Sequence, residues 1–261
     1  MQLSFYKYQG TGNDFILIDN RLNAIALTTE QIRWLCDRRF GIGADGLILL
    51  ELENDADFKM VYYNSDGNPS SMCGNGGRCI TAFAKQLGII KNKAKFLATD
   101  GWHEASIDEN EIVALKMKDV KSIEVGADFF YLNTGSPHYV KIAKAIEHLD
   151  VKNSGSAIRY NNRFKEEGTN VNFIERQDDY LFVRTYERGV EDETFSCGTG
   201  VVASAIVAAI SGISTSKNAC LIKTLGGNLE VKFERVLEQN FYNIWLIGPA
   251  VMVFNGSINL P

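Results

Sequence analysis

Two cysteines stand in the same unusual setting, each directly before a glycine-rich turn that opens an apolar helical pattern. Cys73 precedes Gly74-Asn75-Gly76-Gly77, and Cys197 precedes Gly198-Thr199-Gly200. The backbone N–H groups at a helix N-terminus are unpaired, and the helix dipole there favours negative charge. Both effects stabilise a thiolate relative to a thiol. The sequence therefore predicts two reactive cysteines.

The two settings belong to an internal repeat. Cys197 follows Cys73 by 124 positions, and the glycines that end the two apolar runs, Gly88 and Gly212, have the same separation. Pairs of residues nearer the N-terminus recur at an offset of 123, namely Thr11-Gly12 as Thr134-Gly135 and Tyr63-Asn64 as Tyr186-Glu187. A repeat of this length predicts two similar lobes, because the units of a solenoid are much shorter.

Two opposed thiols suit proton transfer at both faces of one carbon atom. One thiolate removes the proton, and the opposite thiol returns one from the other side, which inverts the centre. The carbanion-like intermediate needs strong stabilisation, and two helix N-termini aimed at an adjacent carboxylate can supply it. The donors would be the N–H groups of Gly74, Asn75, Gly198 and Thr199. Such a site needs no pyridoxal-type lysine.

Both halves of the chain have the same predicted order of elements: strand, turn, strand, helix, strands, cysteine helix and hairpin. These elements must position the residues described above. Hairpin signals outnumber βαβ signals, which favours an α+β fold with mixed or antiparallel sheets. We expect the lobe boundary within residues 118–128. In the first half the expected elements are strands at Leu3–Lys7, Phe15–Asp19, Leu47–Leu52 and Phe58–Tyr63, a helix at Leu27–Phe40 and a hairpin about Asp100-Gly101.

The composition of the chain argues against several classes of protein. The 261 residues are 45% hydrophobic and carry a net charge of −5 without a basic block, which argues against a nucleic-acid partner. The start has no signal-peptide pattern, and no apolar run is long enough to span a membrane, so we expect a cytoplasmic protein. Five cysteines are an odd number, which disfavours a disulfide scaffold. The Cys73–Cys79 spacing does not fit a zinc site, and no metal is expected.

A set of short stretches, taken in order over nearly the whole chain, resembles the diaminopimelate epimerase family. The stretches are Gly12-Asn13-Asp14-Phe15, Phe40-Gly41-Ile42-Gly43-Ala44-Asp45-Gly46, Asn64-Ser65-Asp66-Gly67, Met72-Cys73-Gly74-Asn75-Gly76, Pro137-His138, Asn170-Val171-Asn172-Phe173, Tyr186-Glu187-Arg188-Gly189 and Cys197-Gly198-Thr199-Gly200. The resemblance implies a cofactor-independent epimerase that interconverts LL- and meso-2,6-diaminopimelate, in lysine and peptidoglycan precursor biosynthesis. It also implies a homodimer.

The resemblance further implies an architecture of two pseudo-symmetric lobes, each a sheet curled around a central helix. Residues 1–119 would form the N-terminal lobe, to which residues 250–261 return, and residues 120–249 the C-terminal lobe. The active site would lie in the cleft between them, a favoured position for small-molecule sites.

The same resemblance assigns roles to individual residues. Cys73 and Cys197 resemble the acid/base pair, while His138 and Glu187 resemble the groups that tune and orient it. Substrate contacts are implied for Asn13, Asn64, Gly74, Asn75, Asn170, Glu187, Arg188, Gly198 and Thr199. Two positions depart from the family pattern and are not assigned to the site: Gly46, where certain members carry glutamine, and Ser136, where many carry asparagine.

Simpler interpretations account for other features. Cys36, Cys79 and Cys220 lack the glycine-rich context and are expected to be buried small hydrophobes. The run Gly198–Ala203 also fits a dinucleotide-binding fingerprint. However, that fingerprint follows a strand, and here we expect only the polar loop Glu191–Ser196 before it.

Three other functions remain open at this point. The first is a proline racemase or hydroxyproline epimerase, whose families resemble Met-Cys-Gly-His-Gly at the first cysteine, where this chain has Asn75. The second is a non-catalytic protein that holds an anion at the paired helix ends. The third, a dithiol redox protein, has less support, because such pairs usually occur as Cys-x-x-Cys.

Overall fold

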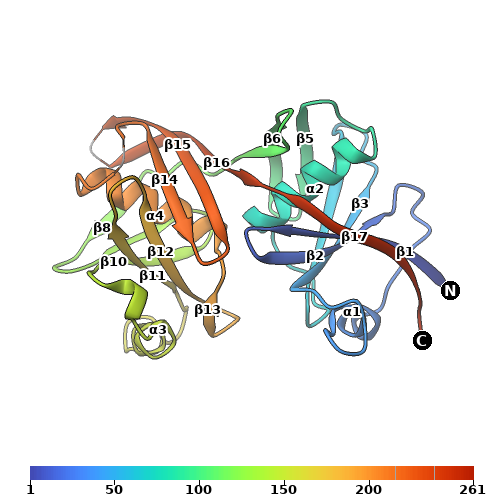
Figure 1. Ribbon diagram of the computed structural model, residues 1–261, viewed down its shortest axis with the longest axis horizontal. Coiled ribbons are helices and arrows are strands. Elements are labelled where there is room, and N and C mark those ends of the chain that lie inside the picture. The colour runs from blue at the N-terminus through green and yellow to red at the C-terminus, as the bar shows by residue number, and fades with distance from the viewer. Residues whose placement is uncertain (215, 238) are drawn as a thin grey trace. The chain divides into compact units, whose positions relative to one another are not determined.

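The computed structural model describes residues 1–214, 216–237 and 239–261 (Figure 1). The chain divides into two compact units. The first contains Met1–Leu115 together with Gly248–Pro261, and the second contains Lys116–Ile247.

The first unit is built on a mixed sheet. Its strands are β1 (Gln2–Gly10), β2 (Asn13–Asp19), β3 (Gly46–Glu51), β4 (Phe58–Asn64), β5 (Lys93–Ala98), β6 (Gly101–Ile107), β7 (Ile112–Lys116) and β17 (Val251–Asn259). The pairs β2–β3 and β4–β5 are parallel, and the pairs β17–β1, β1–β2, β3–β4, β5–β6 and β6–β7 are antiparallel. The last segment of the chain therefore pairs with the first.

One helix lies at the centre of this unit. Helix α2 (Gly74–Gln86) is buried from Gly74 to Ala84 and contacts strands β1, β2, β3, β6 and β17. In Figure 1 the strands of the first unit surround α2, and the shorter helix α1 (Thr29–Cys36) lies on the outside of the sheet. A helix that is buried on all sides is held by packing along its whole length, so its N-terminus is fixed in position.

The second unit repeats this plan. Its strands are β8 (Ile123–Val125), β9 (Phe130–Asn133), β10 (Pro137–Ile142), β11 (Asn170–Arg176), β12 (Leu181–Glu187), β13 (Asp192–Thr194), β14 (Ala219–Thr224), β15 (Gly227–Leu237) and β16 (Asn240–Pro249), which ends past the unit boundary. The apolar helix α4 (Gly198–Ile210) is buried from Val201 to Ala208 and contacts six of these strands. The predicted α+β class, with a mixed sheet curled around one helix in each half, is confirmed.

Two expected elements differ from the structure. The helix expected at Leu27–Phe40 is α1, which begins after the N-cap Thr28 and ends at Cys36. It stops there because Asp37 is extended, and the Asp37 carboxylate accepts the N–H groups of Arg39 and Phe40. The polar loop expected at Glu191–Ser196 contains the short strand β13, which pairs with β12.

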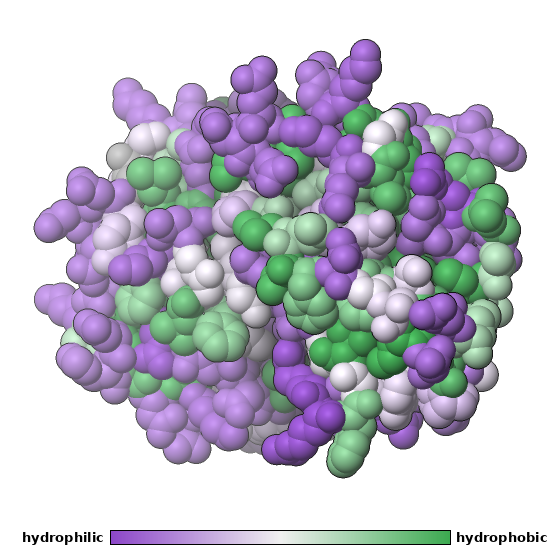
Figure 2. Space-filling model, turned by 45° about the vertical axis from the view of Figure 1, so that its right-hand side comes forward, coloured by the Kyte–Doolittle hydropathy of each residue, from purple (hydrophilic) through white to green (hydrophobic). Residues whose placement is uncertain are grey.

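The face shown in Figure 2 is mostly polar, with apolar side chains interrupting the polar ones in several places. Within the described part of the chain, no helix is both long enough and apolar enough to cross a membrane.

Helix α3 (Val151–Arg159) supports β12, the strand that ends at Glu187, through a close contact at Gly155. A Cβ atom at Gly155 would lie 2.4 Å from the Cβ atom of Tyr186. We expect Gly155→Ala to lower the free energy of unfolding by about 1–3 kcal/mol, because the added Cβ atom overpacks this contact. The higher helix propensity of alanine acts in the opposite direction. Denaturant unfolding measures this effect. The neighbouring Ser154→Ala is the control, and equal stability of both variants would contradict the prediction.

Candidate functional site

Cys73 is the N-cap residue of α2, with an extended backbone (φ −97°, ψ 133°). Its carbonyl accepts the N–H of Gly77 at 2.7 Å, so the first turn of the helix closes directly behind the cysteine. The side chain is half-buried, and its sulfur donates to the Oδ1 atom of Asn13 at 3.6 Å. A helix N-terminus thus lies beside this thiol, as its sequence setting predicts.

The amide of Asn13 is held in one orientation by its neighbours. Its Nδ2 atom donates to the Asp45 carboxylate at 2.6 Å, and its Oδ1 atom accepts from the Nδ2 atom of Asn75 at 3.2 Å. The Cys73 sulfur therefore faces an acceptor, which can bind the protonated thiol but not the thiolate. Asn13 reaches this position because it follows a tight turn in which Thr11 and Gly12 have φ values of 53° and 85°.

An ion cluster fixes the loop that carries Asp45. The guanidinium of Arg38 bridges Asp14 at 2.7 Å and Asp45 at 2.8 Å, and Lys7 pairs with Asp14 at 2.8 Å. Burial by itself raises the pKa of Asp14, but hydrogen bonds from Arg38 and Lys7 outweigh it and hold that pKa at about 2. Asp14 is therefore ionised at neutral pH, and the shared Arg38 anchors the Asp45 carboxylate that orients Asn13.

Cys197 has the same position in the second unit, as the N-cap of α4 (φ −111°, ψ 111°). It is buried, and its sulfur lies 3.5 Å from the hydroxyl of Thr199. That hydroxyl lies 2.9 Å from the Nε2 atom of His138, which is completely buried. Cys197, Thr199 and His138 therefore form one connected group.

The proton positions in this group follow from Asn172. Its Nδ2 atom donates to the carbonyl of Tyr139 at 3.1 Å and to the Nδ1 atom of His138 at 3.0 Å. Its Oδ1 atom accepts from the hydroxyl of Thr185 at 3.0 Å. The Nδ1 atom of His138 is thus an acceptor, so the ring carries its proton on Nε2 and donates to Thr199.

His138 is neutral at physiological pH. Burial, with a contribution from the charge of Arg188, lowers the pKa of His138 to about 3. Since the neutral ring donates to the Thr199 oxygen, the Thr199 hydroxyl proton can point at the sulfur of Cys197. A hydroxyl donor stabilises a thiolate, so the two cysteines differ: Asn13 offers Cys73 an acceptor, whereas the Thr199 hydroxyl can also offer Cys197 a donor.

Arg188 and Asn170 form a second polar group in the same unit. The Asn170 amide donates to the Ser136 hydroxyl and the Pro137 carbonyl, both at 2.9 Å, and accepts the Arg188 N–H at 2.9 Å. The guanidinium of Arg188 donates to the Glu167 carbonyl at 2.9 Å and reaches Ser136 only at 3.5 Å. Among the described residues no carboxylate pairs with Arg188. Its charge is therefore available to an anionic ligand.

The remaining predicted residues lie at strand ends. Glu187 ends β12, and its carboxylate accepts from the Thr194 hydroxyl at 2.9 Å. Asn64 ends β4 and is exposed, and no side-chain hydrogen bond joins it to another predicted site residue in the described chain. Gly74 and Gly198 open the two cysteine helices. Printed contacts thus join Asn13, Asn75 and Cys73 at the N-terminus of α2. They likewise join His138, Thr199 and Cys197 at the N-terminus of α4.

Several residues that the sequence did not assign complete these groups. Asp45 orients Asn13, Asn172 orients His138, and Ser136 contacts both Asn170 and Arg188. Asn172 could have been found from its spacing, because residues two apart on a strand share one face with each other. Glycine at position 46 has a packing reason, since a Cβ atom there would lie 2.6 Å from the Tyr63 carbonyl oxygen.

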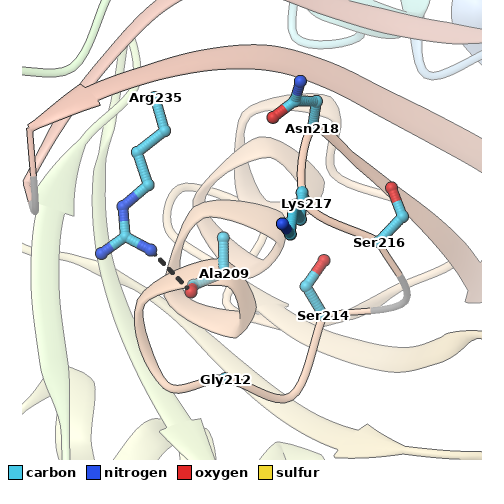
Figure 3. A pocket seen from close by; sticks show the side chains of 7 residues that line it. All are labelled: Ala209, Gly212, Ser214, Ser216, Lys217, Asn218 and Arg235. Atoms are coloured by element: carbon cyan, nitrogen blue, oxygen red, sulfur yellow. Dashed lines mark hydrogen bonds between the residues drawn. The ribbon is translucent and has the colours of Figure 1, made fainter.

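A surface pocket of the second unit lies at the opposite end of α4 from Cys197 (Figure 3). It is lined by Ala209, Gly212, Ser214, Ser216, Lys217, Asn218 and Arg235, and Arg235 donates to the Ala209 carbonyl at 3.1 Å. None of the predicted site residues lines it. Nor does any cluster of three or more His, Cys, Asp or Glu side chains within the described ranges suit a metal ion.

Comparison with known proteins identifies close relatives. A family model described as "Diaminopimelate epimerase" matches residues 5–123 and 130–253. The diaminopimelate epimerase of Flavobacterium psychrophilum is 55% identical over 258 residues, which covers 98% of this chain and 100% of that protein. The diaminopimelate epimerase of Chlorobaculum tepidum is 44% identical over 259 residues, covering 96% of this chain and 99% of that protein.

Two solved structures share the fold at low sequence identity. A phenazine biosynthesis protein of the PhzF family from Bacillus anthracis superposes with a TM-score of 0.77 at 14% identity, over 100% of both chains. A hydroxyproline epimerase from Agrobacterium vitis has a TM-score of 0.72 at 12% identity, covering 98% of this chain and 92% of that chain. At such identity the likeness shows the fold alone.

The buried neutral His138 makes stability depend on pH. The unfolded chain binds a proton at the ordinary histidine pKa of 6.5, whereas the folded protein does so only at about 3. The free energy of unfolding should therefore fall as the pH drops below 6.5, by up to about 1.4 kcal/mol per pH unit. Denaturant unfolding between pH 6.5 and 5 measures this slope, since Asp14 titrates below that range. His138→Gln should remove the slope of unfolding free energy with pH. His148→Gln, at an exposed position, is the control and should keep the slope. A slope that persists in His138→Gln would refute this account.

Proposed function

This chain belongs to the diaminopimelate epimerase family, and we propose that it interconverts LL- and meso-2,6-diaminopimelate by proton transfer at one α-carbon. The observation that carries the proposal is the pair of N-cap cysteines, each at the N-terminus of the buried central helix of its unit. In this reaction one sulfur acts on each face of the α-carbon.

The step requires one thiolate and one thiol. The thiolate takes the α-proton, the bonding electron pair remains on the substrate as a carbanion, and the opposite thiol donates its proton to the other face. The proton lost by the substrate stays on the first sulfur, so atoms and charge balance. The partners of the sulfurs suit this pairing, because Asn13 offers an acceptor to Cys73 and Thr199 can offer a donor to Cys197.

Backbone N–H groups would stabilise the carbanion without a cofactor. The first turns of α2 and α4 begin at Gly74-Asn75 and Gly198-Thr199, and the backbone N–H groups there would bind the α-carboxylate as it takes up negative charge. Donors fixed in place before the reaction need no reorganisation, and removal of one donor of this kind typically costs on the order of 3 kcal/mol of barrier. We therefore propose a reaction independent of pyridoxal phosphate.

The distal end of the substrate carries a second carboxylate and an amino group. We assign the carboxylate to Arg188, whose guanidinium has no ion pair among the described residues and is planar enough for bidentate binding. Asn64, Asn170 and Glu187 would provide the remaining polar contacts, and the Glu187 carboxylate suits the amino group.

We also propose that the protein works as a homodimer in the cytoplasm. Strand β17 pairs with β1, yet Val251, Met252, Val253 and Phe254 are 44%, 40%, 56% and 45% exposed. A contiguous apolar surface of this kind is typical of a protein interface, and a second copy would cover it. The odd number of five cysteines disfavours a disulfide scaffold, which suits a reducing compartment.

Hydrogen exchange tests the reaction directly. In heavy water, without added pyridoxal phosphate, the enzyme should place deuterium at the α-carbon of LL-diaminopimelate as it forms the meso isomer. Cys73→Ala and Cys197→Ala should each lower the epimerisation rate by at least about 10²–10⁴-fold, since each removes one acid/base group. Cys220→Ala, a buried cysteine of a strand, is the control. Absence of exchange in the unmodified protein would refute the proposal.

The same assay separates the alternatives. A proline racemase or hydroxyproline epimerase would exchange the α-proton of those cyclic amino acids instead, and the solved hydroxyproline epimerase shares only the fold with this chain. A non-catalytic anion-binding protein would exchange neither substrate, and both cysteine variants would keep its affinity for the anion.

The role of Arg188 can be tested by comparing the effects of a substitution on KM and on kcat. Arg188→Met removes the charge that we assign to the distal carboxylate, so KM should rise about 10- to 100-fold, the effect of losing one or two charge-assisted hydrogen bonds. The effect on kcat should be smaller, because this end of the substrate does not react. Arg176→Met is the matched control, since Arg176 donates only to backbone carbonyls. An unchanged KM in the Arg188 variant would exclude this contact.

A further inference from the structure

Arg78 is a buried cation for which the reaction described above gives no role. It lies in the second turn of α2, five positions after Cys73, and is 0% exposed. Its guanidinium donates to the Oδ1 atom of Asn75 at 3.1 Å, the hydroxyl of Thr11 at 3.1 Å and the carbonyl of Pro249 at 3.4 Å. All three are neutral oxygens, and no carboxylate of the described chain pairs with Arg78.

A charge buried without an acid is costly, by several kcal/mol even after the protein relaxes around it. Burial accordingly lowers the pKa of Arg78, and the groups that act in the opposite direction are the thiols of Cys79 and Cys73. Cys79 is itself buried, which raises its pKa to about 12 and keeps it protonated. Cys73 is therefore the neighbour of Arg78 that the proposed proton transfer turns into an anion.

The other titratable groups around this site do not neutralise Arg78. On β1, burial raises the pKa of Tyr8 and keeps the phenol protonated. On β2, Asp14 is already paired with Lys7 and Arg38, and Arg38 also holds Asp45. The positive charge near the start of α2 is thus not matched by an acidic side chain among the described residues.

The internal repeat shows that helix packing does not require this arginine. The residue of α4 at the same offset from its cysteine is Val202, which is also 0% exposed. The second unit instead supplies the uncharged group of His138 and Thr199 at its cysteine. The two copies therefore differ in electrostatics although their helices are packed alike.

Arg78 also fixes the Asn75 side chain. Because the guanidinium can only donate, it requires the Oδ1 atom of Asn75 to face it, and the Nδ2 atom then points to Asn13. The space around the guanidinium is tight, since a Cβ atom at Gly10 would lie 3.1 Å from Nη2 of Arg78. Arg78 thus acts, through Asn75, on the amide that contacts the sulfur of Cys73.

We propose that Arg78 is a positioning residue that holds the Asn75–Asn13 pair in register and supplies the buried positive charge that stabilises the thiolate of Cys73. The need arises when Cys73 gives its proton to the substrate. The sulfur then becomes an anion that its acceptor Asn13 cannot bind, and the charge of Arg78 compensates it. This part of the inference rests on the proposed epimerase reaction, whereas the effect on the thiol itself does not.

The test measures the acidity of each cysteine separately. The alkylation rate by iodoacetamide is followed as a function of pH in the full-length protein, and mass spectrometry of peptides resolves Cys73 from Cys197. In Arg78→Met the pH midpoint for Cys73 should rise by about one unit, which is about tenfold slower alkylation below the midpoint. The midpoint for Cys197 in the same molecules should not move. An unchanged Cys73 midpoint, or equal shifts at both cysteines, would overturn the proposal.

Two further variants separate charge from structure. Arg78→Lys keeps the charge and loses the planar fork, so the Cys73 midpoint should stay within a few tenths of a unit while kcat falls through the misplaced Asn75. A Cys73 midpoint that rises in Arg78→Lys as much as in Arg78→Met would overturn the electrostatic role. If Arg78→Met does not fold, Arg78→Gln takes its place, since glutamine can still donate a hydrogen bond to Asn75 but carries no charge.

The alkylation assay uses no substrate, so its outcome is independent of the epimerase assay. A shift confined to Cys73 in a protein without epimerase activity would support the role of Arg78 and refute the proposed function. If the protein is an active epimerase and the alkylation midpoint of Cys73 is unchanged in Arg78→Met, the proposed function is supported and the role of Arg78 is refuted.

Discussion

The structure depends on the N-termini of two buried helices. In each unit a cysteine occupies the N-cap position, where serine, threonine, asparagine or aspartate would normally bond the first turn with its own side chain. Neither cysteine makes such a cap bond, so the sulfur lies beside first-turn donors that its own side chain does not bond. The surrounding sheets hold the helices by burying them along almost their whole length, which fixes the direction of those donors.

The internal repeat provides the two cysteine helices, α2 and α4, but the residues around the two cysteines differ. The residues around Cys73 include an ion cluster, two asparagines and a buried arginine, whereas Cys197 is surrounded by threonine, a neutral histidine and an asparagine. The first environment carries permanent charge, and the second consists of dipoles. The proposed proton transfer between two thiols needs each sulfur to be stable in both of its forms, and the two units would meet this need by different means.

The chain's own pattern was sufficient for the main features because those features are local. The glycines beside Cys73 and Cys197 are enough to predict that each cysteine precedes a helix, and the hairpin signals are enough to predict mixed sheets. The predicted end of α1 is wrong because the apolar period continues past Cys36, whereas the side chain of Asp37 decides where the helix stops. The sequence does not reveal contacts such as Asp45 with Asn13, Asn172 with His138 or Arg78 with Pro249, because the partners are 32, 34 and 171 residues apart. Periodicity carries no information about such contacts.

The pairing of the first strand with the last has a consequence for how the protein is made. Gln2 of β1 lies opposite Asn259 of β17, so the first unit is assembled from both ends of the chain. The second unit is continuous in sequence, from Lys116 to Ile247, and can fold as soon as it has left the ribosome. The first unit must wait with the β1 edge open until Val251–Asn259 has been synthesised. Pro249, which supplies one of the oxygens that bind Arg78, is made just before this strand, so the charged surroundings of Cys73 are completed only at that stage.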